Sequence, residues 1–166
     1  MEPDPARQEV ADAETAGVIT RPPLLYLAAL LTGFVLDRLL PLPFPAPGID
    51  LLHWIIGGSL ILIGLALAAT GIRNFSRVGT PVRSIHPTRA LATTGIHGWT
   101  RNPIYLGMFL IYGGIGVAAQ SPWTLVLTLP LAILIRYGVV AREETYLERR
   151  FGDAYRNYKA RVRRWL

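Results

Sequence analysis

The sequence contains a run of 34 residues, 102–135, in which no side chain carries a formal charge. As one α-helix this run would be about 51 Å long, well beyond the roughly 30 Å hydrocarbon core of a bilayer. The helix-breaking triplet Gln120-Ser121-Pro122 lies near its middle. The run is therefore predicted to form a tight helical hairpin, with one helix over about 103–119 and the next over about 122–140.

Two further apolar segments precede this hairpin. The first, 24–40, is interrupted only by Asp37 and Arg38, and the second, 51–72, is uncharged and about 33 Å long as a helix. Prolines alternate through 41–47 between them, which excludes a helix there. Only 17% of the residues are charged, against about 25% in soluble domains. The predicted fold is all-α, a polytopic membrane bundle with four transmembrane helices in a single domain, 22–166.

The basic residues are concentrated in two connections. Segment 73–101 carries five arginines and segment 141–166 carries eight basic residues, whereas 41–50 and 120–122 carry none. Because basic segments stay in the cytoplasm, both are predicted on that side of the inner membrane, together with both termini. Residues 1–21 are acidic and lack apolar periodicity, and are predicted to be a mobile polar tail.

The C-terminal segment 143–166 has an apolar stripe at helical spacing. Its members are Leu147, Phe151, Tyr155, Tyr158, Val162 and Trp165. The basic residues lie mostly off the stripe, and Gly152-Asp153 is expected to kink or restart the helix. The segment is predicted to be an amphipathic helix that lies on the anionic inner leaflet or caps the bundle.

The segment before the third span has the features of an anion site. Asn102 suits a helix N-cap and Pro103 suits the first turn, and the free N–H groups of such a helix start bind carboxylates or phosphates. His97 and Arg101 lie just before it and can add hydrogen bonds or charge. The alternative is that the segment only anchors and caps the helix at the membrane interface.

Charged residues at the end of the fourth span form a second candidate site. Glu143 and Glu144 lie where the dipole of an ending helix disfavours carboxylates. Pairing with arginines or binding a ligand is therefore favoured over an exposed position without a specific role. Arg136, inside the span, has either a functional role or a snorkelling side chain. The histidines lack metal-site spacing, so no metal is predicted. The basic residues follow the membrane face, and nucleic-acid binding is not expected.

Three blocks in the C-terminal half carry a family resemblance over about 90 residues. They are Phe75-Ser76-Arg77-Val78-Gly79-Thr80-Pro81 with Leu91-Ala92-Thr93-Thr94-Gly95, then Arg101-Asn102-Pro103-Ile104-Tyr105-Leu106-Gly107, and finally Glu143-Glu144 with Phe151-Gly152-Asp153-Ala154-Tyr155. In order and spacing the chain resembles the integral-membrane methyltransferases grouped with isoprenylcysteine carboxyl methyltransferase and phospholipid N-methyltransferases.

The resemblance implies an enzyme that uses S-adenosylmethionine and releases S-adenosylhomocysteine. Its cofactor site would lie on the cytoplasmic side, enclosed by loop 73–102 and the C-terminal segment. The implied cofactor-binding residues are Arg89, Ala90, Leu91, Ala92, His97, Asn102, Pro103, Tyr105 and Glu143, and the candidate catalytic residues are Arg101, Glu143 and Glu144. His97 stands where the family usually has Tyr, and Asn102 where it often has His. Val139 replaces an Arg of members that methylate prenylated cysteine.

The implied reaction is an in-line displacement at a sulfonium methyl, in which positioning supplies most of the catalysis. The acceptor would partition from the bilayer, as a lipid amine, a prenyl-type carboxylate, or a small lipophilic thiol or hydroxyl. The alternative is a non-catalytic membrane scaffold or lipid-binding protein that retains the fold.

Overall fold

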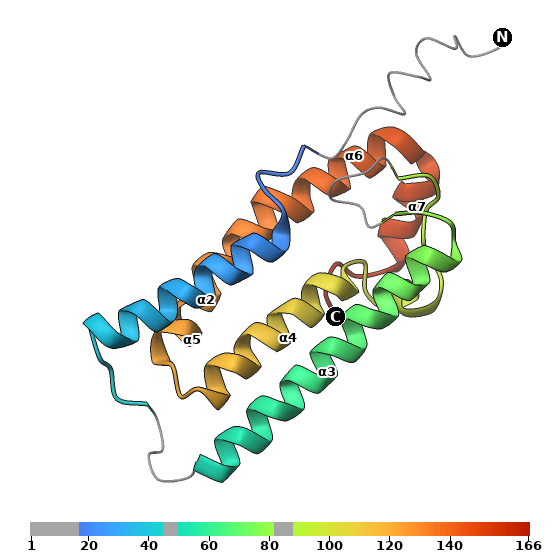
Figure 1. The fold of residues 1–166 in the computed structure, drawn as a ribbon. Helices are drawn as coiled ribbons and strands as arrows, with labels where there is room; N and C mark the ends of the chain where they lie inside the picture. The colour runs from blue at the N-terminus through green and yellow to red at the C-terminus, as the bar shows by residue number, and fades with distance from the viewer. Residues whose placement is uncertain (1–16, 45–49, 82–87) are drawn as a thin grey trace, which may run out of the picture.

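The computed structural model describes residues 17–44, 50–81 and 88–166, and these form helices with no strand among them. The long helices lie side by side, with α4 beside both α3 and α5, and α2 packed on α5 (Figure 1). Their bounds are Pro22–Leu39 for α2, Asp50–Arg77 for α3, Pro103–Ala118 for α4 and Pro122–Ile133 for α5. The all-helical prediction is confirmed.

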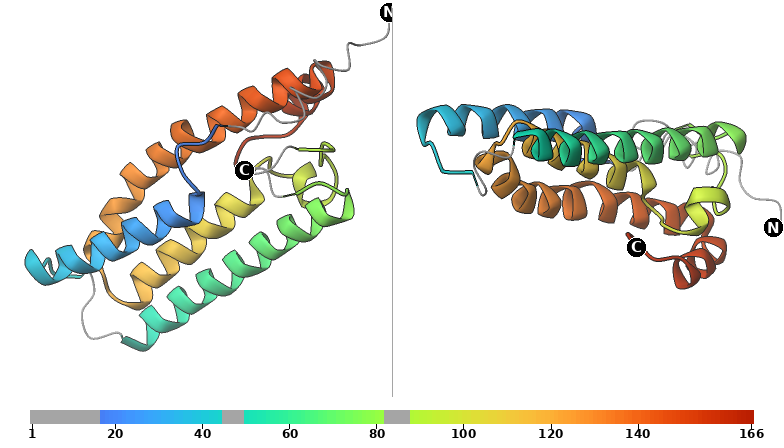
Figure 2. Two further views of the ribbon diagram at one scale, coloured as in Figure 1. Left: turned by 45° about the horizontal axis from the view of Figure 1, so that its top comes forward. Right: turned by 90° about the horizontal axis from the view of Figure 1, so that it is seen from below.

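The last long helix runs further than the sequence pattern predicts. After α5, a π-helical segment η2 (Leu134–Val140) leads directly into α6 (Ala141–Phe151), giving one continuous helix of 30 residues. The predicted end of the span at residue 140 is therefore not a helix end, and Glu143 and Glu144 lie inside the helix. Gly152, with φ of 52°, ends it, and α7 (Asp153–Arg161) leaves in a new direction, as expected for Gly152-Asp153 (Figure 2).

Three helices in the described residues are long and apolar enough to cross a membrane. They are Pro22–Leu39, Asp50–Arg77 and Pro122–Phe151. The predicted number of four spans is not confirmed, because α4 has 16 residues and is about 24 Å long. Large apolar side chains on the outer faces of α2 and α3 are exposed, among them Leu31, Val35, Leu51, Trp54 and Leu62. Unpartnered apolar faces of this extent are those of a membrane protein.

The predicted tail 1–21 is described only from residue 17 onward. There the backbone N–H of Ile19 donates to the carbonyl of Gly138 at 3.4 Å, and Arg142 Nη1 donates to the carbonyl of Gly17 at 2.9 Å. Val18 is half-buried against apolar side chains of the bundle. Residues 17–21 therefore belong to the packed part of the molecule.

Asp37, the acid near the end of the first span, caps another helix. Its carboxylate accepts hydrogen bonds from the hydroxyl of Ser121 and, at 3.2 Å, from the backbone N–H of Trp123. Both donors lie at the start of α5, where backbone N–H groups have no partner within the helix. The charged residue therefore holds α2 against the turn between α4 and α5.

Glycines bring α3 and α4 into backbone contact. A Cβ placed on Gly64 would lie 2.6 Å from the carbonyl oxygen of Gly107, and one on Gly57 would lie 2.6 Å from that of Gly114. Small residues permit such close approach between membrane helices. Gly57, Gly64 and Gly71, spaced seven residues apart, therefore form a close-packing face of α3 against α4.

We expect Gly64→Ala to destabilise the protein by about 1–3 kcal/mol, because the new methyl group meets backbone that cannot move unless the helices separate. The matched control is Gly58→Ala on the same helix, where a Cβ meets nothing within 4 Å. Thermal unfolding in detergent should show a lower midpoint for Gly64→Ala than for Gly58→Ala. Equal midpoints would contradict the close contact.

Candidate functional site

A cavity of about 470 Å³, partly open to the surroundings, lies where α4 begins. It is lined by Pro22, Pro23, Phe75, His97, Arg101, Asn102, Pro103, Ile104, Tyr105, Met108 and Glu143. Six of these residues, His97, Arg101, Asn102, Pro103, Tyr105 and Glu143, are also site residues predicted from the sequence.

The start of α4 has the predicted position but a different capping arrangement. Asn102 occupies the N-cap and Pro103 the first turn, yet the Asn102 side chain makes no capping hydrogen bond. Its Nδ2 instead donates to the carbonyl of Arg164 at 3.0 Å. The first turn of an α-helix has N–H groups without helical acceptors, and Ile104 and Tyr105 of this turn line the cavity.

The chain's last residues lie along this helix start. The backbone N–H of Arg101 donates to the carbonyl of Arg163 at 3.0 Å, and the hydroxyl of Thr100 donates to that of Arg164 at 3.2 Å. The predicted apolar stripe faces inward, with Leu147, Tyr155 and Tyr158 buried. The Tyr158 hydroxyl donates to the backbone carbonyl of His97 at 2.7 Å. The C-terminal segment thus caps this end of the bundle.

Glu144 joins two arginines from distant parts of the chain. Its Oε1 lies 3.3 Å from Arg101 Nη1, and it accepts hydrogen bonds from Arg164 Nε at 2.8 Å and Nη2 at 2.5 Å. These hydrogen bonds raise the pKa of Arg164 above its ordinary value. Glu144 is buried and does not line the cavity. Its contacts are those of a structural ion pair.

The contact with Glu144 satisfies only part of the hydrogen-bonding capacity of the Arg101 guanidinium. The residue is 7% exposed, and its buried Nε and Nη1 make no hydrogen bond to the described residues. A buried polar group without a hydrogen bond is costly. Arg101 also lines the cavity, so an anionic group bound there would supply the missing acceptor.

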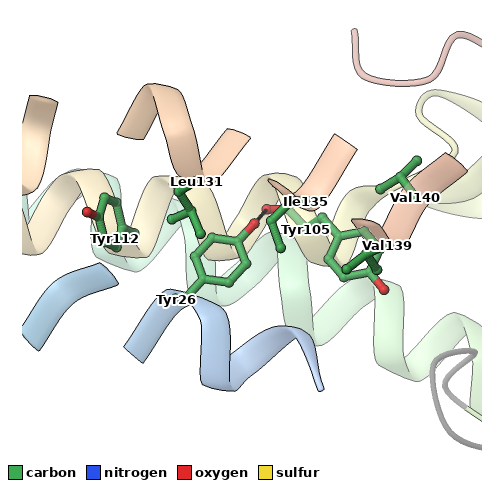
Figure 3. Close-up of a cluster of buried hydrophobic side chains, with 7 residues drawn as sticks. All are labelled: Tyr26, Tyr105, Tyr112, Leu131, Ile135, Val139 and Val140. Atoms are coloured by element: carbon green, nitrogen blue, oxygen red, sulfur yellow. Dashed lines mark hydrogen bonds between the residues drawn. The ribbon is translucent and has the colours of Figure 1, made fainter. Parts of the chain in front are cut away.

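Glu143 is linked to two other helices by tyrosines. The Tyr105 hydroxyl donates to Glu143 Oε1 at 2.7 Å, and the Tyr26 hydroxyl donates to the backbone carbonyl of Tyr105 at 3.2 Å (Figure 3). The π-helical segment η2 immediately precedes α6, which carries Glu143, and such segments occur often at functional sites. This chain of contacts fixes the carboxylate against the wall of the cavity.

The other predicted cofactor-binding residues do not line the cavity. Arg89 donates its backbone N–H to Thr80 Oγ1 at 2.9 Å. Leu91 packs against the apolar cluster of Tyr146, Leu147, Tyr155 and Tyr158, and Ala92 is fully buried. The guanidinium carbon of Arg136 lies 5.5 Å from the ring centre of Tyr137. The roles of Arg89, Ala90, Leu91, Ala92 and Arg136 stay predictions.

Several residues around the cavity were not predicted as site residues. Phe75 belongs to a recognised sequence block, and its ring centre lies 4.6 Å from that of His97. Met108 lies one turn beyond Tyr105. The sequence therefore placed it near the motif but did not indicate a role for it. Asn74 and Arg164 have no distinguishing signal in the sequence. No group of three metal-binding side chains occurs among the residues that the structure describes.

The exposed apolar helices and the cavity at one end of the bundle are those of a membrane protein with a candidate site for a small molecule. Residues 52–154 match the family described as phospholipid methyltransferase. This match covers more than half of the chain, and the protein therefore belongs to the phospholipid methyltransferase family. The predicted resemblance to this family is confirmed.

A shorter match relates the chain to an uncharacterized protein of Haemophilus influenzae. The two are 62% identical over 34 residues, which are 20% of this chain and 54% of that protein. The match thus spans about half the length of this curated relative. No solved structure matches the chain.

Proposed function

We propose that the protein transfers a methyl group from S-adenosylmethionine to a lipophilic acceptor drawn from the bilayer. The observation that carries the proposal is the buried Arg101 guanidinium, which lines the cavity beside the first turn of α4 and keeps Nε without a hydrogen bond to the described residues. The cofactor's carboxylate suits this position, because guanidinium and helix N–H groups both favour anions.

Glu143 gives the cavity a second specific group. A carboxylate accepts hydrogen bonds from ribose hydroxyls or lies near a cationic centre, and both occur in S-adenosylmethionine. Tyr105 holds this carboxylate by its 2.7 Å hydrogen bond. The residues present in the cavity thus fit the two ends of the cofactor.

S-adenosylmethionine, when bound, supplies an activated methyl group on a sulfonium centre. The chain's own residues orient and enclose the reactants. Arg101 and the start of α4 hold an anionic end, Glu143 fixes a second point, and the apolar side chains of Phe75 and Met108 exclude water. Fixing both reactants in line is the main source of catalysis for such a displacement.

An apolar groove beside the cavity supports a lipophilic acceptor. The groove, about 500 Å³ in volume, lies between α2 and α4. It is lined by Tyr26, Leu27, Leu30, Met108, Ile111, Tyr112 and Ile115. Met108 lines both the groove and the cavity. An apolar chain in the groove would place its polar end toward His97 and Glu143.

The active site and both chain ends are proposed to face the cytoplasm. The two basic segments meet at the same end of the bundle, where Arg101 contacts Arg163. Exposed basic side chains of α7, such as Arg156, Lys159 and Arg161, would face the anionic leaflet of the inner membrane.

Calorimetric titration with S-adenosylmethionine and S-adenosylhomocysteine tests the proposal. Protein in lipid nanodiscs should bind both saturably, with one ligand per chain, and should transfer a labelled methyl group into the lipid extract. The chemistry of the labelled product identifies the acceptor atom. Absence of binding to folded protein would overturn the proposal. Binding without transfer to any lipid would instead support the alternative of a non-catalytic scaffold or lipid-binding protein.

A further inference from the structure

Asn74, near the end of α3, contacts two groups through the same side-chain nitrogen. Its Nδ2 lies 2.8 Å from the backbone carbonyl oxygen of Thr94 and 2.8 Å from Nδ1 of His97. A carbonyl oxygen only accepts hydrogen bonds, so the atom facing Thr94 is the amide nitrogen and not its oxygen. This nitrogen has two hydrogens, and the two contacts use both.

The contact fixes the position of the proton on His97. Because the Asn74 nitrogen donates, Nδ1 of the imidazole must accept, and the ring proton then resides on Nε2. An imidazolium would carry a hydrogen on Nδ1 and oppose it to the amide hydrogen at 2.8 Å. The arrangement therefore selects the neutral Nε2–H form.

The surroundings hold both side chains in this geometry. His97 is fully buried, with its ring against Phe75. The turn before it is shaped around the amide: Gly95 has φ of 59°, and a Cβ there would lie 3.1 Å from Asn74 Oδ1. These contacts oppose a flip of the His97 ring and of the Asn74 amide.

We infer that Asn74 is a positioning residue that makes His97 a hydrogen-bond donor in the cavity, and not a base that removes a proton from the methyl acceptor. His97 lines the cavity, and its Nε2–H would donate to an oxygen or other acceptor atom of the bound molecule. That this molecule is S-adenosylmethionine or its methyl acceptor rests on the proposed function. The tautomer itself does not.

Nitrogen NMR of ¹⁵N-histidine-labelled protein tests the tautomer directly. His97→Gln removes one of the three histidines and so assigns the signals. In the wild-type protein we expect a protonated Nε2 and an unprotonated Nδ1 for His97 at neutral pH. A proton on Nδ1, or on both nitrogens, would overturn the inference. This measurement needs no ligand and no activity.

Asn74→Asp tests the role of the amide. The carboxylate accepts where the amide donates and also favours a positively charged ring beside it, so Nδ1 should gain a proton and its ¹⁵N signal should move to the protonated range. Asn157→Asp, at an exposed position of α7, is the control for added charge and should leave Nδ1 of His97 unprotonated. An unprotonated Nδ1 in folded Asn74→Asp would refute the positioning role. If the wild-type protein binds no S-adenosylhomocysteine, the proposed function fails, while the NMR result still decides the tautomer.

Discussion

Replacing Glu144 by Gln is expected to lower the free energy of unfolding by about 3–5 kcal/mol, the cost of removing one partner from a buried ion pair. The side chains of Arg101 and Glu144 are 7% and 10% exposed, and Arg164 adds two hydrogen bonds to the same carboxylate. Glutamine is neutral and nearly isosteric, so the substitution leaves two neighbouring guanidinium groups without their counter-charge.

Glu148→Gln, one turn further along α6, is the matched control. Its carboxylate pairs with Lys159 at 3.0 Å, but the two side chains are 34% and 41% exposed. An exposed pair of this kind contributes at most about 1 kcal/mol. Denaturant unfolding in detergent, followed by tryptophan fluorescence, measures both variants. A Glu144→Gln protein as stable as Glu148→Gln would show that the buried pair does not hold the C-terminal segment.

The long helices could be predicted because an apolar run without charges has few alternatives to a helix, and Gln120-Ser121-Pro122 marks the turn between α4 and α5. The continuation of the last helix to Phe151 could not be predicted from the sequence. Hydropathy indicates where a helix leaves the apolar phase, not where its backbone hydrogen bonds stop. The charges of Arg142, Glu143 and Glu144 end the apolar run, but Gly152 ends the helix.

Residues of the candidate site could be predicted only where they belong to a short block of the sequence. Asn102, Pro103 and Tyr105 fall in one short block, and all three line the cavity. The contact between Asn102 and Arg164 joins residues 62 apart in the chain, and no periodicity relates them. The same holds for the contact between Asn74 and His97, which depends on how the loop folds back onto α3.

Glu143 and Glu144 show how adjacent residues of one type take different environments. Neighbours on a helix point to different faces. Glu143 lines the cavity with Tyr105, whereas Glu144 pairs with Arg101 and Arg164. The family resemblance implied a catalytic role for both and cofactor binding for Glu143 alone, but their adjacent positions did not show that Glu144 would form an ion pair.

Replacing Glu143 by Gln is therefore expected to affect binding far more than stability. The amide oxygen still accepts the Tyr105 hydrogen bond, so the cost in unfolding free energy should be well below that of Glu144→Gln. A hydrogen bond to a charged group contributes about 1.5–3 kcal/mol, and its loss should weaken S-adenosylhomocysteine binding by about 10- to 150-fold. Calorimetry on Glu143→Gln, with Glu148→Gln as the control, measures this. Equal affinities would remove Glu143 from the cofactor site, and a stability loss as large as that of Glu144→Gln would make it a structural residue instead.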